Sequence, residues 1–380
     1  MRRSQEKILT THVGSLPGDE PRDAAAPDYE EKLGTSVEEV VARQRDVGLD
    51  IINEGEYTKG GDWLSFMDGR LGGCEARPDD DSGNPAQAGR DRQAFAEFYK
   101  FAAETGTLHG HTPGRRGTYK RLTWYCTGPF TYIGQAKLER EIKITKAAAG
   151  TEDVFLTSTA PASLEPYYRN EYYDSQEALI LGMAEALRTE YEAIVDAGLI
   201  LQIDDAWLPV AWDRSDMAAL GLDGYRDWCR VRIDALNHAL KGIPEDRVRY
   251  HLCWGSWRGP HAFDIELKEI VDIMLSVNAG AYLIEAANAR HEHEYVVWND
   301  VKLPEGKILV PGVVSHATDH IEHPELVAQR ICRFAERVGR ENVMAGTDCG
   351  FGGRSHPQIA WAKLKSLADG AKLASEALGY

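Results

Sequence analysis

The stretch Leu-Ile-Leu-Gln-Ile-Asp-Asp-Ala-Trp at 199–207, with Arg-Tyr-His-Leu-Cys-Trp at 249–254, decides the fold. Both are short apolar runs, and a helical pattern near 225–240 separates them. Two strands joined by a helix predict a βαβ unit with parallel strands. The alternation continues, with strand-like runs at 281–287, 307–315 and 342–346 and helical patterns near 265–276, 325–338 and 358–377.

The first half of the chain repeats the pattern with a break. Strand-like runs occur at 8–16, 50–54 and 154–160, and helical patterns at 37–47 and 176–197. Eight strand candidates with intervening helices predict a single (β/α)8 TIM barrel over residues 1–380. The pattern weakens between about 59 and 120, where we expect an insertion. Acidic, glycine and proline residues predict a surface loop at 77–92, and histidine, proline and glycine predict another at 109–114.

Bulk composition limits the partners of this chain. Its 380 residues carry a formal net charge of −17, so there is no basic excess for nucleic-acid phosphates or an anionic membrane surface. No apolar run approaches the roughly 20 residues that span a bilayer, and no secretion signal is recognisable. We therefore expect a cytoplasmic protein that binds small molecules, with homo-oligomer formation left open. The six cysteines are scattered without a CxxC pair, so no disulfide framework is expected.

Four candidate metal ligands end strands of the second half. His251 and Cys253 are two residues apart on one strand, so both side chains point to the same side of the sheet. Glu285 and Cys349 end later strands, and a carboxylate that ends an apolar strand is costly unless paired, ligated or catalytic. Ligands dispersed over strand ends favour a catalytic metal site over a structural one. The alternative for His-x-Cys alone is core packing.

Six motifs in order resemble a known family. They are Thr-Thr-His-Val-Gly-Ser-Leu-Pro at 10–17, Gln-Ile-Asp-Asp at 202–205, His-Leu-Cys at 251–253, Ile-Glu-Ala at 284–286, Pro-Gly-Val-Val at 311–314 and Asp-Cys-Gly at 348–350. Together they resemble the catalytic barrel of cobalamin-independent methionine synthase. The epoxyalkane:coenzyme M transferases of the same superfamily resemble this chain in their single-barrel length.

The resemblance implies that His251, Cys253, Glu285 and Cys349 bind Zn²⁺. Zinc would hold a small-molecule thiol as its thiolate, and the thiolate would attack an electrophilic carbon of an alkyl donor. The role of the metal would then be to generate and orient a nucleophile.

The resemblance also implies roles for residues around the metal. Glu56 and Asp204 match the two carboxylates that grip the amino group of homocysteine, and Asp204 is also a candidate catalytic residue. Ser15 matches the serine that contacts the carboxylate, and His12 beside it is a candidate substrate-binding residue. His316 is the candidate general acid. The same patterns also fit a solvated turn at 54–56, a helix cap at 204–205, an exposed loop at 316–323 and a surface helix start at 291–293.

Three functions remain open from the sequence. The first is zinc-dependent transfer of a methyl or other alkyl carbon to a homocysteine-type thiol. The alkyl donor need not be polyglutamyl folate, because the tryptophan that stacks on folate in the family has no match after Ala162. The second is epoxide opening by coenzyme M, whose sulfonate would need a cationic anchor such as Lys59, Arg169 or Arg290. The third is a non-catalytic zinc- or thiol-binding barrel.

Overall fold

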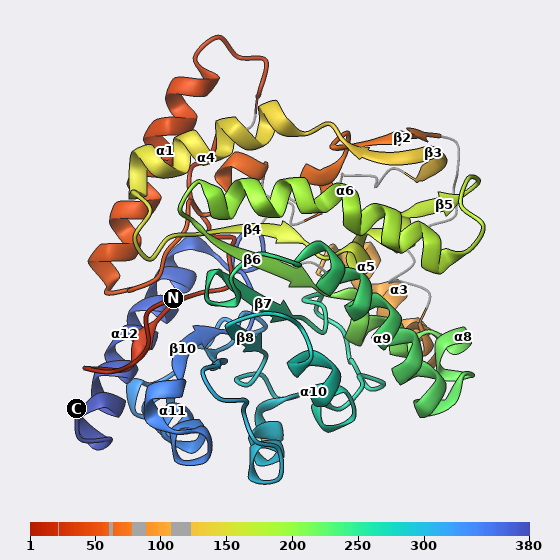
Figure 1. Ribbon diagram of the computed structural model, residues 1–380. Coiled ribbons are helices and arrows are strands. Elements are labelled where there is room, and N and C mark those ends of the chain that lie inside the picture. Colours follow the sequence, from red (N-terminus) through yellow and green to blue (C-terminus); the bar gives the residue numbers. More distant parts are fainter. Residues whose placement is uncertain (22, 61–63, 78–88, 108–122) are drawn as a thin grey trace.

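A curled parallel sheet with helices packed around it organises the computed structural model (Figure 1). The structure describes residues 1–21, 23–60, 64–77, 89–107 and 123–380. All neighbouring strands of the sheet are parallel. In these residues its strand order is β1 (Leu9–Thr10), β10 (Met344–Thr347), β9 (Ile308–Val314), β8 (Ala281–Ile284), β7 (Val248–Leu252), β6 (Ile200–Asp205) and β4 (Phe155–Thr159).

Amphipathic helices cover the outside of the sheet. In α11, Val327, Ile331 and Phe334 are buried at the spacing of one helical face. The longer helices are α1 (Tyr29–Val47), α4 (Gln135–Ala149), α6 (Gln176–Asp196), α9 (Gly221–Ala239), α10 (Leu267–Leu275), α11 (Pro324–Val338) and α12 (Pro357–Ala377). The shorter ones are α2 (Arg90–Ala94), α3 (Ala96–Thr105), α5 (Pro161–Leu164), α7 (Trp207–Val210) and α8 (Ser215–Ala218). No helix in the described ranges is long and apolar enough to cross a bilayer.

The expected strand at 50–54 is present only as a short connection between the two edge strands. The amides of Asp50 and Ile51 donate to the Thr10 carbonyl at 3.1 and 3.0 Å. Ile52 forms an isolated parallel bridge with Val154 beside β4. These contacts establish a mixed α/β fold with a curled parallel sheet, and closure into a complete eight-stranded barrel stays a prediction.

Apolar side chains fill the inside of the curled sheet below the ends of its strands. This cluster comprises Leu9, Val13, Ile51, Phe155, Ile200, Ala281, Leu283, Ile308, Val310 and Met344. Strand β7 adds a charged residue, Arg249, whose guanidinium carbon lies 4.0 Å from the centre of the Phe155 ring. Because this filled layer supports the strands from within, side chains at their carboxyl ends project from a packed base.

A second, three-stranded sheet is a feature that the sequence did not predict. Strand β2 (Leu71–Ala76) pairs antiparallel with β3 (Trp124–Tyr132), which pairs parallel with β5 (Tyr168–Asn170). Buried Arg70, next to β2, donates to Glu190 of α6 at 2.9 Å and to Glu141 of α4. Strand β2 and helices α2 and α3 therefore give regular structure to the described part of the expected insertion, and most of the surface loop expected at 77–92 lies outside the described residues. The loop expected near 109–114 lies outside the described residues.

Candidate metal and substrate site

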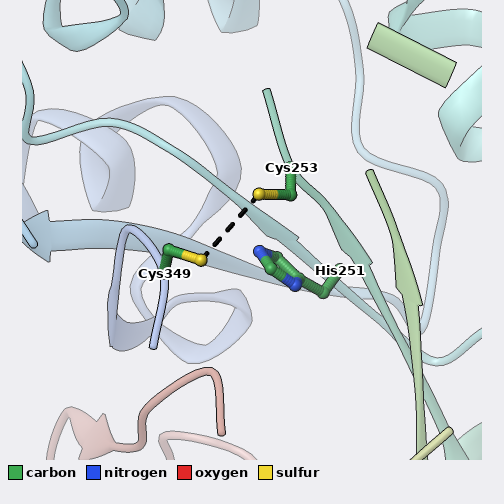
Figure 2. Close-up of side chains that lie close together, drawn as sticks. All are labelled: His251, Cys253 and Cys349. Carbon is green, nitrogen blue, oxygen red and sulfur yellow. Dashed lines mark hydrogen bonds between the residues drawn. The ribbon is translucent and has the colours of Figure 1, made fainter. Parts of the chain in front are cut away.

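The four candidate ligands converge at the carboxyl ends of β7, β8 and β10. His251 lies on β7 and Cys253 directly follows it, whereas Glu285 follows β8 and Cys349 follows β10. The Sγ atoms of Cys253 and Cys349 are 3.8 Å apart, and Glu285 Oε1 lies 3.9 Å from Cys253 Sγ. The ligand atoms of His251, Cys253 and Cys349 all lie within 4.8 Å of one another (Figure 2). All four side chains are buried.

The spacing and the donor set fit a tetrahedral metal ion. With metal–sulfur bonds of about 2.3 Å, two sulfur corners of a tetrahedron lie about 3.8 Å apart, which matches the observed 3.8 Å. His251 Nε2 is buried and has no hydrogen-bond partner among the described residues. Nδ1 of the same ring is held by Asp204 Oδ1 at 2.9 Å, and this contact leaves the Nε2 lone pair for a metal. One nitrogen, one oxygen and two sulfurs therefore suit zinc.

The two thiols differ in their readiness to lose a proton. A hydrogen bond from Cys253, aided by the positive charge of Arg354, holds the pKa of Cys349 well below its usual range. The same hydrogen bond, together with burial, raises the pKa of Cys253. The amide of Gly255 donates to Cys253 Sγ at 3.4 Å. The Cys349 thiol therefore loses its proton more readily than the Cys253 thiol, and a metal held by both sulfurs would require both to be deprotonated.

Glu285 is held by three nitrogen donors in addition to the long contact with Cys253. The Trp254 amide donates to Oε1 at 3.0 Å. Oε2 accepts hydrogen bonds from Asn288 Nδ2 at 2.7 Å and from Arg290 Nη2 at 2.6 Å. Asp348 accepts the amides of residues 286 and 287, and so joins the ends of β8 and β10. The sequence did not single out Asn288, and it indicated Arg290 only as an available anchor for a sulfonate, although Asn-Ala-Arg directly follows the predicted strand end.

Glu56 and Asp204 form a pair of buried carboxylates. Glu56 has a left-handed backbone with φ of 60°, a conformation that costs of order 1–3 kcal/mol and is common at functional sites. Burial and then the charges of Asp204 and Glu54 raise the pKa of Glu56 to about 8. A helix cap was the alternative role for residues 204–205. Asp205 fits that role better than Asp204, because its Oδ1 accepts a hydrogen bond from the amide of Leu208 in α7 at 3.4 Å. Asp204 instead supports His251.

Ser15 lies against the loop that follows Cys349. Its carbonyl accepts the amides of Phe351 and Gly352 at 2.8 and 2.9 Å. A Cβ at Gly350 would collide with Ser15 Oγ, so this close approach requires glycine. Arg354 Nη1 donates to the Gly350 carbonyl at 2.7 Å, and its Nε is buried without a partner in the described chain. Sequence reasoning missed Arg354, although it follows the Cys-Gly-Phe-Gly-Gly turn.

The two predicted functional histidines lie in different surroundings. His316 follows β9 and is buried, with Nδ1 unpartnered within the described ranges. Burial lowers the pKa of His316 to about 4. His12 Nε2 lies 2.7 Å from Gln44 Oε1, and burial lowers the pKa of His12 to about 3. The roles of both histidines stay predictions. The surface position expected for His291 is wrong, because its ring is buried and pairs with Glu294 at 2.8 Å.

Comparisons with known proteins agree with this arrangement. The family described as "Cobalamin-independent synthase, Catalytic domain" matches residues 162–373. A methionine synthase of Saccharolobus solfataricus is 27% identical over 241 residues, a match that covers 63% of this chain and 63% of that protein. This match thus spans less than two thirds of the relative. A methionine synthase of Sulfolobus acidocaldarius is 23% identical over 355 residues, which cover 92% of this chain and 84% of that protein.

A solved structure shows the same fold. The B12-independent methionine synthase from Shewanella sp. W3-18-1, in complex with selenomethionine, has a TM-score of 0.70 and 19% identity, with 98% of this chain and 99% of that chain covered. The matched family region spans more than half of the present chain and contains all four candidate ligands. The chain therefore belongs to the cobalamin-independent synthase catalytic-domain family.

Proposed function

We propose that this protein is a zinc-dependent enzyme that transfers a methyl or other alkyl carbon to the thiol of a homocysteine-type amino acid. The observation that carries the proposal is the convergence of His251, Cys253, Glu285 and Cys349 at one end of the sheet. Zinc, when bound there, lowers the pKa of a thiol so that the thiolate is present at neutral pH. The relatives named methionine synthase support a methyl group as the transferred carbon.

Charged groups beside the ligand cluster favour an amino-acid thiol. The charge of Asp204 adds to burial in raising the pKa of Glu56, and a substrate ammonium beside Glu56 would offset both effects. Ser15 and the unpartnered Nε of Arg354 offer donors to a carboxylate. A zwitterionic amino acid needs both kinds of contact, with its thiol reaching toward Cys349.

The transfer itself is a displacement at carbon. The substrate sulfur forms a bond to the alkyl carbon while the bond from that carbon to its leaving group breaks, and the leaving group keeps the electron pair. We assign His316 as the proton donor to a basic leaving group, a role that requires the bound state to raise its pKa from the value of about 4 that burial imposes. Asp204 holds His251 in the tautomer that ligation needs. The candidate ligands are all buried, and such burial would limit the access of water to the nucleophile.

The residues of α5 and its neighbours support an alkyl donor other than polyglutamyl folate. Residues 161–164 form α5, where the resemblance places the folate-stacking tryptophan, and every side chain of this helix is buried. Ser163 Oγ is bound to Asp205 at 3.1 Å, and neighbouring Glu165 pairs with Arg232. These residues offer no exposed aromatic face to a pterin. The donor class is left to experiment.

Coenzyme M as the thiol, with an epoxide as the electrophile, is the second candidate, and Arg354 favours it because a sulfonate needs a cation. Two of the three cations that the sequence offered as sulfonate anchors already have protein partners. Lys59 Nζ donates to the Thr157 carbonyl at 2.7 Å, and Arg290 pairs with Glu285. Coenzyme M has no amine that could pair with Glu56 and Asp204, so we prefer homocysteine as the thiol.

Zinc-edge X-ray absorption of the purified protein tests the proposal. Wild-type protein should contain one zinc with two sulfur ligands, and homocysteine should add a third sulfur. If only coenzyme M adds sulfur, the epoxide reaction is correct instead. A zinc shell that neither thiol changes would favour the non-catalytic barrel, and protein purified without zinc would refute the metal assignment.

A further inference from the structure

The two oxygens of Glu285 have different environments. Oε1 accepts a hydrogen bond from the Trp254 amide at 3.0 Å and a long one from Cys253 Sγ at 3.9 Å. Oε2 is engaged by Asn288 and Arg290 at 2.7 and 2.6 Å. The second contact is an ion pair with a carboxylate that is fully buried. One oxygen is therefore directed at the ligand cluster and the other is held away from it.

Arg290 is itself fixed in place. Its Nη1 donates to Asp264 Oδ2 at 2.9 Å and to His261 Nδ1 at 2.7 Å. His261 Nδ1 also lies 3.1 Å from Asp264 Oδ1, and Nε2 of the same ring lies 3.2 Å from the Trp257 carbonyl oxygen. The ring of His261 also stacks on Trp257, with ring centres 4.0 Å apart. The guanidinium is thus held by partners on both sides.

The part of the insertion that forms α2 and α3 anchors this arrangement. Asp91 of α2 accepts the amides of His261 and Ala262 at 3.2 and 2.9 Å. Tyr99 of α3 donates to Asp91 at 2.5 Å and accepts from Trp257 Nε1 at 3.1 Å. His261 has a positive φ of 53°, which these contacts hold. The loop that fixes Arg290 is therefore fixed by the insertion.

We propose that Arg290 is a positioning residue that restricts Glu285 to ligation through Oε1 alone. A carboxylate with both oxygens free can bind a metal with two, and it then occupies the room that an incoming sulfur needs. By holding Oε2, Arg290 also withdraws negative charge from the ligating group, so Glu285 yields readily to a substrate thiol. The inference rests on the proposed metal site. It explains why the buried guanidinium of Arg290 pairs with Glu285 although a positive charge weakens the binding of a carboxylate to a metal.

The test compares Arg290→Met with wild type by zinc-edge absorption, by metal competition with a chromophoric chelator, and by homocysteine binding to the zinc-loaded protein. We expect Arg290→Met to gain an oxygen neighbour at zinc, to keep or raise its metal affinity, and to bind homocysteine about tenfold more weakly. Arg290→Lys keeps the charge and should lie between the two, which also covers the case in which Arg290→Met does not fold.

Arg232→Met is the matched control. Arg232 also pairs with a buried glutamate, Glu165, through hydrogen bonds of 2.6 and 3.0 Å, but this glutamate is not one of the candidate ligands. Its loss should change stability and leave zinc and thiol binding alone. If Arg290→Met instead loses metal affinity by about 10–100-fold with an unchanged oxygen count, Arg290 only orients Glu285 and the inference is wrong. Failure of the proposed function is distinguishable, because wild type itself would then lack zinc or ignore homocysteine.

Discussion

The substitution Glu56→Gln tests how the protein distinguishes an amino-acid thiol from other thiols. The side chain is buried beside Asp204, and Gln keeps its size while removing its charge. Because the pKa of Glu56 is raised to about 8, only about one tenth of the carboxyl groups are ionised near pH 7 and about one hundredth near pH 6. Binding an ammonium requires the ionised form. The wild-type affinity for homocysteine should thus fall up to about tenfold for each pH unit below 8.

The glutamine variant should lose both the charge and the pH dependence. An ion-assisted hydrogen bond contributes about 1.5–3 kcal/mol, so the affinity for homocysteine near pH 8 should fall about 10- to 150-fold. Calorimetric titration between about pH 6 and pH 8 measures this directly. The matched ligand is 4-mercaptobutanoate, which has the same chain and thiol without the amine. The ratio of the two affinities cancels the ionisation of the thiol, and it should be independent of pH in the variant.

The same pKa shift has a consequence for stability. A carboxyl whose pKa is raised from 4.5 to about 8 on folding contributes stability that is complete below its unfolded pKa and is lost as pH rises through 8. Glu56→Gln should therefore unfold at a higher temperature than wild type above about pH 8 and show little advantage below about pH 4.5. The reasoning is refuted if the variant keeps the pH slope, or if it weakens homocysteine and 4-mercaptobutanoate equally.

Three further predictions address other parts of the structure. Asp204→Asn should lower zinc affinity about 10–100-fold in chelator competition, because the carboxylate no longer holds His251 Nδ1; unchanged affinity would contradict that role. His316→Gln should slow transfer about 10²–10⁴-fold from donors with basic leaving groups and leave methyl iodide unaffected, whereas equal slowing would refute acid catalysis. Arg70→Met should cost about 3–5 kcal/mol in urea unfolding, because it leaves buried Glu190 without its cation; a loss below about 1 kcal/mol would show that the pair is unimportant.

The parallel sheet and the ligand cluster were predictable because both follow from short-range rules. Strand alternation places residues 251 and 253 on one side of β7, and parallel strands bring the ends of β8 and β10 to the same edge. The positions of these strands could therefore be predicted from the local pattern of apolar residues alone. Glu285 was recognisable as a buried carboxylate at the end of an apolar run, and it is indeed fully buried.

What the sequence left unpredicted depends on contacts between distant segments. The strand β2 contains the pair Gly72–Gly73, which weakens its pattern, and it exists through pairing with β3 more than fifty residues later. Asp204 could not be assigned to His251 because the two are joined only when β6 pairs with β7. Arg354 gave no periodic signal, since its position comes from a glycine turn packed on Ser15.

The charge balance of the site links these pieces. Burial and the neighbouring Glu285 raise the pKa of Asp348 to about 7, just as burial and Asp204 raise that of Glu56 to about 8. Two buried carboxyls that hold protons at neutral pH release them when a positive charge arrives nearby. A divalent ion beside Glu285 and a substrate ammonium beside Glu56 would each supply such a charge, so each should bind with proton release. The metal and the ammonium would therefore each favour the ionised form of the carboxyl nearest to it. Calorimetric titration of each ligand separately, in two buffers of different ionisation enthalpy, would measure the protons released in each event.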